Sequence, residues 1–155
     1  MAFSARYKEL FLPIPDSWLH DAWIALIVTV YAHLAIIDQP LIKYRQHLNQ
    51  QLGAIKKGFI KQMTVLKKTK SNIYFTQLNR YILAQSLLAN NYSTTPCNKE
   101  VFLMLEAKMD HLIIRGNMPK QKLRRLIVII KELAALRYHR YSYGWKSAAR
   151  DLFFN

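Results

Sequence analysis

Residues 55–155 carry apolar side chains at helical spacing, and no stretch within them alternates apolar and polar residues with a period of two. This spacing places the apolar side chains on one face of a helix and argues against half-buried strands. It predicts helices over residues 55–69, 72–89, 98–115 and 119–138, with a short final element after residue 141. Asn98 is a predicted N-cap, and Gly116 fits the left-handed position that follows a helix.

The first 54 residues are more mixed in character. Two prolines in "LPIPD" (residues 12–16) favour an extended segment, and apolar positions then recur at helical spacing from residue 18 to about 32. The stretches "LAIID" and "LIKYRQH" are split by Gln39-Pro40, which is typical of two short strands or extended segments joined by a tight turn. The predicted fold class is therefore mainly α with a small β or extended element near residues 34–47.

The net charge of +14 is distributed unevenly along the chain. Residues 1–54 hold four cations and four anions, whereas residues 55–155 hold nineteen cations and five anions. This contrast predicts a neutral part (1–54) and a basic helical part (55–155). A basic surface of this kind favours a polyanionic partner, which is a nucleic acid, an anionic membrane surface or an acidic protein.

Several functional classes lack support in the sequence. The longest apolar run, residues 23–32, is well short of the ~18–20 residues that cross a bilayer. The sequence has no Gly-rich phosphate loop, no zinc-ligand spacing, no Gly-x-Ser-x-Gly and no Asp-x-Asp. Its single cysteine, Cys97, excludes an intramolecular disulfide framework and fits a reducing compartment.

The stretch "SWLHDAWIALIV" (residues 17–28) places His20 and Asp21 at the start of an apolar helix. A carboxylate in the first turn of a helix is stabilised by the helix dipole and by unpaired amides, so helix capping is one explanation for Asp21. Trp18 and Trp23 flank the pair, and indole rings beside a carboxylate are a common way to bind a sugar ring. These residues leave two interpretations of Asp21, a cap and a catalyst.

The stretch "YRQH" (residues 44–47) follows an extended segment and leads into a Gln- and Asn-rich loop. The planar, permanently charged guanidinium of Arg45 suits a phosphate or diphosphate. His47 can donate to phosphate or bind a divalent metal, although no second ligand follows at metal-site spacing. A solvated strand end is the simpler alternative for these four residues.

Taken together, "LPIP…HDAWIAL…IIDQPLIKYRQHLNQQLGA" resembles the C-terminal end of the catalytic domain of family 2 glycosyltransferases, particularly the rhamnosyltransferase-like members. In that family a His-Asp or Glu-Asp pair opens a helix, and a Pro-Leu-x-x-Tyr-Arg-x-His segment then leads into Asn, Gln and Gly. The likeness covers residues 12–54, and "YSYGWKSAARDLF" resembles the closing segment of the family more loosely. Leu48 and Ala32 stand where the family often has glycine.

The resemblance implies that Asp21 is the general base that deprotonates an acceptor hydroxyl for inverting attack on a nucleoside-diphosphate sugar. Trp18, His20 and Trp23 would shape the acceptor side. Arg45 and His47 would lie near the donor diphosphate or its metal, which is Mn or Mg in the complete enzyme. The family's nucleotide-binding half, with its βαβ sheet and Asp-x-Asp, is not found in this sequence, so a separate N-terminal half is an expected partner.

The expected protein is thus a piece of an α/β glycosyltransferase A fold, the acceptor-side residues 1–54, followed by a basic helical region. It would use a glycan or lipid-linked acceptor in polysaccharide assembly, in the cytoplasm and peripherally at the inner face of the membrane. The alternative is a non-enzymatic basic helical module that binds nucleic acid, a membrane surface or a partner protein. No recognised nucleic-acid motif supports the nucleic-acid option.

Overall fold

The computed structural model describes residues 2–42, 72–91 and 98–154. The described elements are η1 (Ala5–Tyr7), α1 (Lys8–Phe11), α2 (His20–Tyr31), α4 (Asn72–Asn91), α5 (Lys99–Gly116), α6 (Lys122–Ala134), α7 (Arg137–Tyr141) and α8 (Trp145–Phe154). No strand occurs within these three ranges. The prediction of a mainly helical protein is therefore confirmed for this part of the chain.

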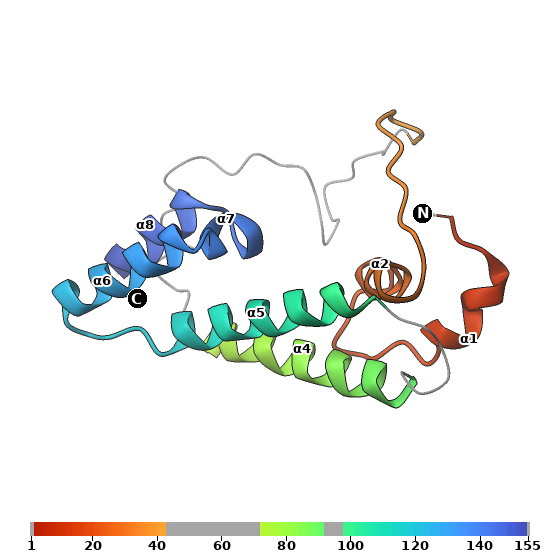
Figure 1. The fold of residues 1–155 in the computed structure, drawn as a ribbon, viewed down its shortest axis with the longest axis horizontal. Coiled ribbons are helices and arrows are strands. Elements are labelled where there is room, and N and C mark those ends of the chain that lie inside the picture. Colours follow the sequence, from red (N-terminus) through yellow and green to blue (C-terminus); the bar gives the residue numbers. More distant parts are fainter. Residues whose placement is uncertain (1, 43–71, 92–97, 155) are drawn as a thin grey trace, which may run out of the picture.

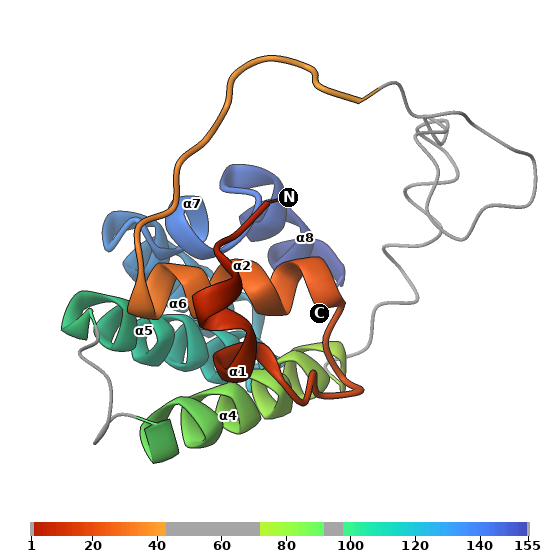
Figure 2. The same cartoon turned by 90° about the vertical axis from the view of Figure 1, so that its right-hand side faces the viewer.

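Helices α4 and α5 lie side by side and antiparallel and form the base of the fold (Figure 1). Helices α1 and α2 pack at one end of this pair, while α6, α7 and α8 gather at the other end (Figures 1 and 2). No helix in the described ranges is long and apolar enough to span a membrane.

The largest core joins the N-terminal segment to the base pair. Helix α2 contributes Trp23, Ile27 and Val30, which pack with residues of α1, α4 and α5. The other buried members of this core are Phe11, Ala84, Leu88, Val101 and Leu105. The predicted division at residue 54 lies outside the described residues, and residues on its two sides share this core.

The three C-terminal helices form a separate small core around Ile129, Tyr138 and Ala148. Their connections require two unusual backbone conformations, because Leu136 has φ 56° and Gly144 has φ 58°. A single helix was predicted over residues 119–138, but the left-handed Leu136 ends α6 and starts α7. Glycine suits position 144, where the chain turns from α7 into α8.

The two ends of helix α5 test two predictions that rest on single residues, Asn98 and Gly116. The side chain of Asn98 accepts a hydrogen bond from the Glu100 amide at 3.0 Å, which confirms the predicted N-cap. Gly116 does not adopt the predicted left-handed conformation; it is the last residue of α5, where a Cβ atom would come within 2.8 Å of the Phe75 ring. Close packing of α5 against α4 therefore explains this glycine.

Residues 33–42 form neither a helix nor a strand and extend away from the helices (Figure 2). The strand option for residues 34–42 is thus not realised, while residues 43–47 lie outside the described ranges. A short hairpin is only marginally stable unless other strands or a helix cover it. Here Ile36 and Ile42 are 86% and 77% exposed, so no such cover is present among the described residues.

Candidate functional site

His20 and Asp21 lie exposed in the first turn of α2, as the sequence predicts. Asp21 Oδ1 accepts a hydrogen bond from the Ala22 amide at 2.8 Å, so its carboxylate satisfies one free amide of the first turn, while the N-cap residue itself is Leu19. The remainder of the carboxylate faces solvent. Asp21 is therefore placed where it can both stabilise the helix and meet an external hydroxyl.

The two tryptophans that flank this pair differ in their surroundings. Trp23 is 2% exposed and its indole N–H donates to the Phe11 carbonyl at 2.9 Å, so we assign it to the core and not to an acceptor surface. Trp18 is only partly buried, and its indole N–H donates to the Arg80 carbonyl at 3.2 Å. The Arg80 guanidinium lies over the Trp18 ring, 4.8 Å from its centroid.

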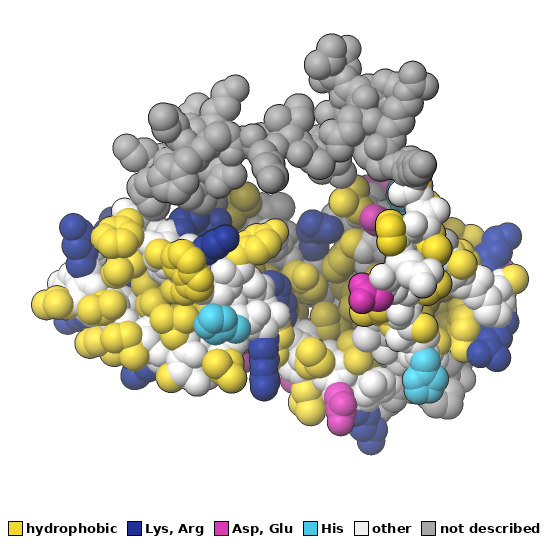
Figure 3. Space-filling view, turned by 90° about the horizontal axis from the view of Figure 1, so that it is seen from above, with side chains coloured by type: hydrophobic (Ala, Val, Ile, Leu, Met, Phe, Trp, Pro, Cys, Tyr) yellow, Lys and Arg dark blue, Asp and Glu magenta, His cyan; other side chains and the backbone are white. Residues whose placement is uncertain are grey.

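Trp18 forms part of a pocket of about 440 Å³ at the junction of α2, α4, α5 and the α7–α8 region. The surface is hollowed between α2 and the C-terminal helices, and Lys and Arg side chains lie beside the hollow (Figure 3). The pocket is lined by Trp18, Ala22, Ile73, Tyr74, Gln77, Arg80, Tyr81, Lys108, Arg115, Tyr141, Ser142, Tyr143, Ser147 and Arg150. This lining combines four cations with five aromatic rings and contains no carboxylate.

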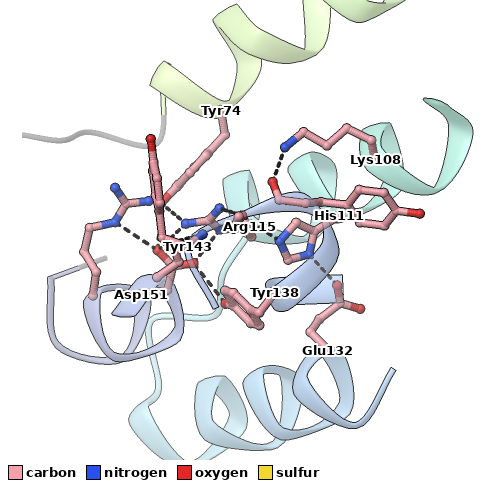
Figure 4. Close-up of polar contacts among 12 residues, drawn as sticks. Tyr74, Lys108, His111, Arg115, Glu132, Tyr138, Tyr143 and Asp151 are labelled. Carbon is pink, nitrogen blue, oxygen red and sulfur yellow. Dashed lines mark hydrogen bonds and ion pairs between the residues drawn. The ribbon is translucent and has the colours of Figure 1, made fainter. Parts of the chain in front are cut away.

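Behind the pocket wall, the buried residues Arg115 and Asp151 form a two-pronged ion pair (Figure 4). Arg115 Nε donates to Asp151 Oδ2 at 2.6 Å and Nη2 donates to Oδ1 at 3.1 Å. The hydroxyls of Tyr74 and Tyr138 also donate to Asp151, at 2.7 and 2.9 Å. One carboxylate thereby links α4, α5, α7 and α8.

The proton affinities of these groups fit a cluster with fixed charges. Burial, together with the Asp151 charge, raises the pKa of Tyr74 to about 12, and the same causes raise the pKa of Tyr138. Burial by itself would lower the pKa of Arg115, but the hydrogen bond and charge of Asp151 outweigh it and raise that pKa. Both phenols therefore stay protonated as donors, and Arg115 stays charged.

A second buried pair extends the cluster toward α6. His111 Nδ1 lies 2.7 Å from Glu132 Oε2, and His111 Nε2 lies 3.1 Å from Ser142 Oγ. Burial lowers the pKa of His111 despite the hydrogen bond to Glu132, so we assign a neutral ring that donates to Glu132 and accepts from Ser142. Ser142 Oγ in turn accepts from Arg115 Nη1 at 2.5 Å. The side chain of His111 is completely buried.

Lys108 and Arg80 are the pocket cations that are not held by a carboxylate within the described part of the chain. Lys108 Nζ donates to the Tyr141 carbonyl and lies 5.9 Å from the centroid of the Tyr81 ring. Burial and the nearby Arg115 charge lower the pKa of Lys108 to about 8. Positive charge in this pocket is therefore incompletely neutralised by the residues that the structure describes.

Two of the predicted residues lie in a part of the chain that the structure does not describe. Arg45 and His47, predicted near a donor diphosphate, lie outside the described residues. Sequence analysis did not single out Arg80, Lys108 or Arg150, because isolated cations on three different helices carry no local motif. One usable signal was present in α5, where Lys108, His111 and Arg115 recur at i, i+3 and i+7 and so share one face.

No family model, curated protein or solved structure matches this chain. Among the described residues, no three His, Cys, Asp or Glu side chains come together in a group that could hold a metal ion. The chemistry that the site offers is therefore argued from its own residues: an exposed carboxylate at the start of α2, and an aromatic, cationic pocket beside it.

Proposed function

We propose that this chain is the acceptor-side, C-terminal part of an inverting glycosyltransferase that uses a nucleoside-diphosphate sugar in polysaccharide or glycan assembly. The observation that carries the proposal is the position of Asp21. Its carboxylate is exposed in the first turn of α2, and its neighbour Ala22 and the nearby Trp18 line the aromatic pocket. The residue pattern over 12–54, to which Asp21 belongs, supports the same class.

In the proposed reaction, Asp21 accepts the proton of an acceptor hydroxyl. The acceptor oxygen then forms a bond to the anomeric carbon of the donor sugar, and the bond from that carbon to the diphosphate breaks with inversion. Such a positioned base contributes ~10² to 10⁴-fold to the rate. Trp18 supplies an aromatic face beside the base, and His20 lies next to it at the solvent surface.

The donor site is proposed to lie in a separate N-terminal half, either upstream in the same protein or in another chain. Apolar side chains of residues 36–42 support such a contact, because Ile37 and Leu41 are 65% and 70% exposed in addition to Ile36 and Ile42. Large exposed apolar patches commonly mark interaction surfaces. The divalent metal that the resemblance implies is assigned to that donor half and not to the described residues.

We also propose that the complete enzyme works against an anionic membrane surface, and α6 supports this. This helix buries Arg125, Ile129 and Glu132 and exposes an apolar stripe on its opposite side. The α6 apolar stripe consists of Leu123, Leu126, Ile127 and Ile130. Hydrophobic side chains cover much of the end of the molecule formed by α6–α8 (Figure 3).

Cations accompany this stripe, whereas the one acidic residue of α6 is buried. Lys122, Arg124 and Lys131 are exposed, while Glu132 is paired with His111 and Arg137 in the interior. An apolar helix face bordered by Lys and Arg is the arrangement of helices that lie in the interface of anionic membranes.

The test of the proposed reaction begins with the sequence upstream of residue 1 and the adjacent reading frames. A βαβ pattern with Asp-x-Asp is expected there, and the two parts are then expressed together. Asp21→Asn should keep the melting temperature, because the amide oxygen of asparagine can accept the same hydrogen bond from the Ala22 amide. It should lower sugar transfer by ~10² to 10⁴-fold, because an amide cannot accept the proton.

Asp16→Asn is the matched control, since Asp16 is an exposed carboxylate that lies outside α2. This variant should leave transfer unchanged. Asp21→Ala should lose transfer and also about 1 kcal/mol of stability through the lost hydrogen bond to Ala22. Near-normal transfer by Asp21→Asn would show that the carboxylate is only a helix cap.

A further inference from the structure

The pocket beside α2 carries more positive charge than the described carboxylates neutralise, and this excess has no role in the proposed proton transfer to Asp21. Of its four cations, Arg115 is neutralised by Asp151, and Arg150 Nε lies 3.5 Å from the same carboxylate. That carboxylate is therefore shared by two arginines. Arg80 and Lys108 add two further charges, with no described carboxylate within 4.0 Å of either.

Two of these arginines are also incompletely hydrogen-bonded by the protein. The Nε atoms of Arg80 and Arg150 are buried and make no hydrogen bond to a described residue, although Arg150 Nε lies 3.5 Å from Asp151 Oδ1. A guanidinium group has five N–H donors, so an arginine that the protein pairs only in part keeps hydrogen-bonding capacity for an anion. Charge and hydrogen-bonding capacity thus point to the same kind of ligand.

We propose that this pocket binds the phosphate or diphosphate group of a ligand, held by Arg80 and Lys108 with Arg150 at its edge. Guanidinium groups match the oxygen geometry of phosphate, and lysine adds a compact charge. A pocket of about 440 Å³ also leaves room for a group attached to the phosphate, next to the rings of Trp18 and Tyr81. The proposed function identifies this ligand as a phosphorylated acceptor, and the identification rests on that function.

Phosphate fits the lining better than a carboxylate ligand does. Cations line the pocket from α4, α5 and α8, so a group that presents oxygens in several directions can contact more than one of them. A single carboxylate has two oxygens in one plane and can satisfy one guanidinium fork. The donors on three helices therefore favour the tetrahedral arrangement of a phosphate group.

Calorimetric titration of the chain with inorganic pyrophosphate at fixed ionic strength tests the proposal. Saturable binding at one site per chain is expected. Arg80→Gln and Lys108→Gln should each weaken it by about tenfold, the loss expected for one charge-assisted hydrogen bond. Circular dichroism and melting temperature confirm that each variant is folded.

Lys122→Gln is the matched control, because it removes the same charge from an exposed position on α6. It should change pyrophosphate affinity by less than about twofold, as a screened surface charge does. The absence of saturable pyrophosphate binding, or an equal loss in Lys122→Gln, would overturn the proposal. Neither result depends on sugar transfer, so the phosphate site and the proposed reaction fail independently.

Geranyl diphosphate as a second titrant separates the two sources of such a group. Binding at least tenfold tighter than that of pyrophosphate would assign the pocket to a lipid-linked diphosphate, with the hydrocarbon packing on the aromatic lining. Equal affinity for both would assign it to the phosphate of a soluble ligand. In both cases, Arg80→Gln should weaken the binding of geranyl diphosphate as it weakens the binding of pyrophosphate.

Discussion

Asp151 is the residue whose replacement should most clearly test the described packing. Its carboxylate accepts two hydrogen bonds from Arg115 and one each from Tyr74 and Tyr138, at 2.6–3.1 Å, and the side chain is 1% exposed. Asp151→Ala removes both acceptor oxygens, and with them all four hydrogen bonds, and leaves the buried Arg115 without its counter-charge. Breaking one side of a buried ion pair typically costs ~3–5 kcal/mol.

This cost is a large part of the ~5–15 kcal/mol that stabilises a typical domain. At ~2–4 °C per kcal/mol for a chain of this size, Asp151→Ala should lower the melting temperature by ~6–20 °C. Thermal and urea unfolding followed by circular dichroism measure the change. Asp110→Ala is the control, because it removes an exposed carboxylate from α5 and should alter stability by no more than ~0.5 kcal/mol.

A double replacement separates the loss of the pair from the loss of packing. Replacing both partners of a buried ion pair by apolar residues is often close to neutral, because no uncompensated charge remains. Arg115→Met with Asp151→Leu should therefore be more stable than Asp151→Ala alone. If Asp151→Ala melts within about 3 °C of the wild type, or the double variant is no better, the buried pair as described is wrong.

Two further outcomes follow from the surface and the pocket. The protein should sediment with anionic liposomes but not with neutral ones, and equal binding to neutral liposomes would contradict the proposal. The double variant Leu123→Ser with Ile127→Ser should weaken binding to anionic liposomes by at least about tenfold. Leu103→Ser, which replaces an exposed leucine on α5, should leave that binding unchanged. Pyrophosphate affinity should fall by up to about tenfold from pH 7 to pH 9, because Lys108, whose pKa is about 8, loses its proton beside the constant charges of Arg80 and Arg115. Protonation of Lys108 favours binding, so affinity is highest below its pKa, and a wild-type pH profile identical to that of Lys108→Gln would refute this.

Helix positions were largely predictable because their signals are local. Apolar spacing located α2, α4 and α5 to within a few residues, and Asn98 marked the start of α5 through its own side chain. The break at Leu136 was missed, since the surrounding sequence continues the helical pattern. It is explained by tertiary packing, because the turn lets Tyr138 bury its ring with Ile129 and Ala148.

The candidate site was only partly predictable, because several of its residues meet only through tertiary packing. Asp21 and Trp18 belong to one short motif. Trp18 lines the pocket, and Asp21 is exposed next to Ala22, which also lines it. Trp23, which is buried four residues before Ile27 on the same apolar face of α2, shows that a motif does not reveal which way a ring points. Arg80, Lys108 and Arg150 meet only through the packing of α4, α5 and α8, which no spacing in the sequence records.

The Arg115–Asp151 pair also determines how the molecule should come apart. The core around Trp23 and the core around Tyr138 share no buried residue, and the polar cluster joins α7 and α8 to the base pair. Parts of a protein joined in this way can open as separate cooperative units. Amide hydrogen exchange should therefore show α6–α8 opening at a lower free energy than α2, α4 and α5. Because Ser142 and Arg150 line the pocket, each such opening would dissolve the phosphate site while the helix that carries Asp21 stays folded.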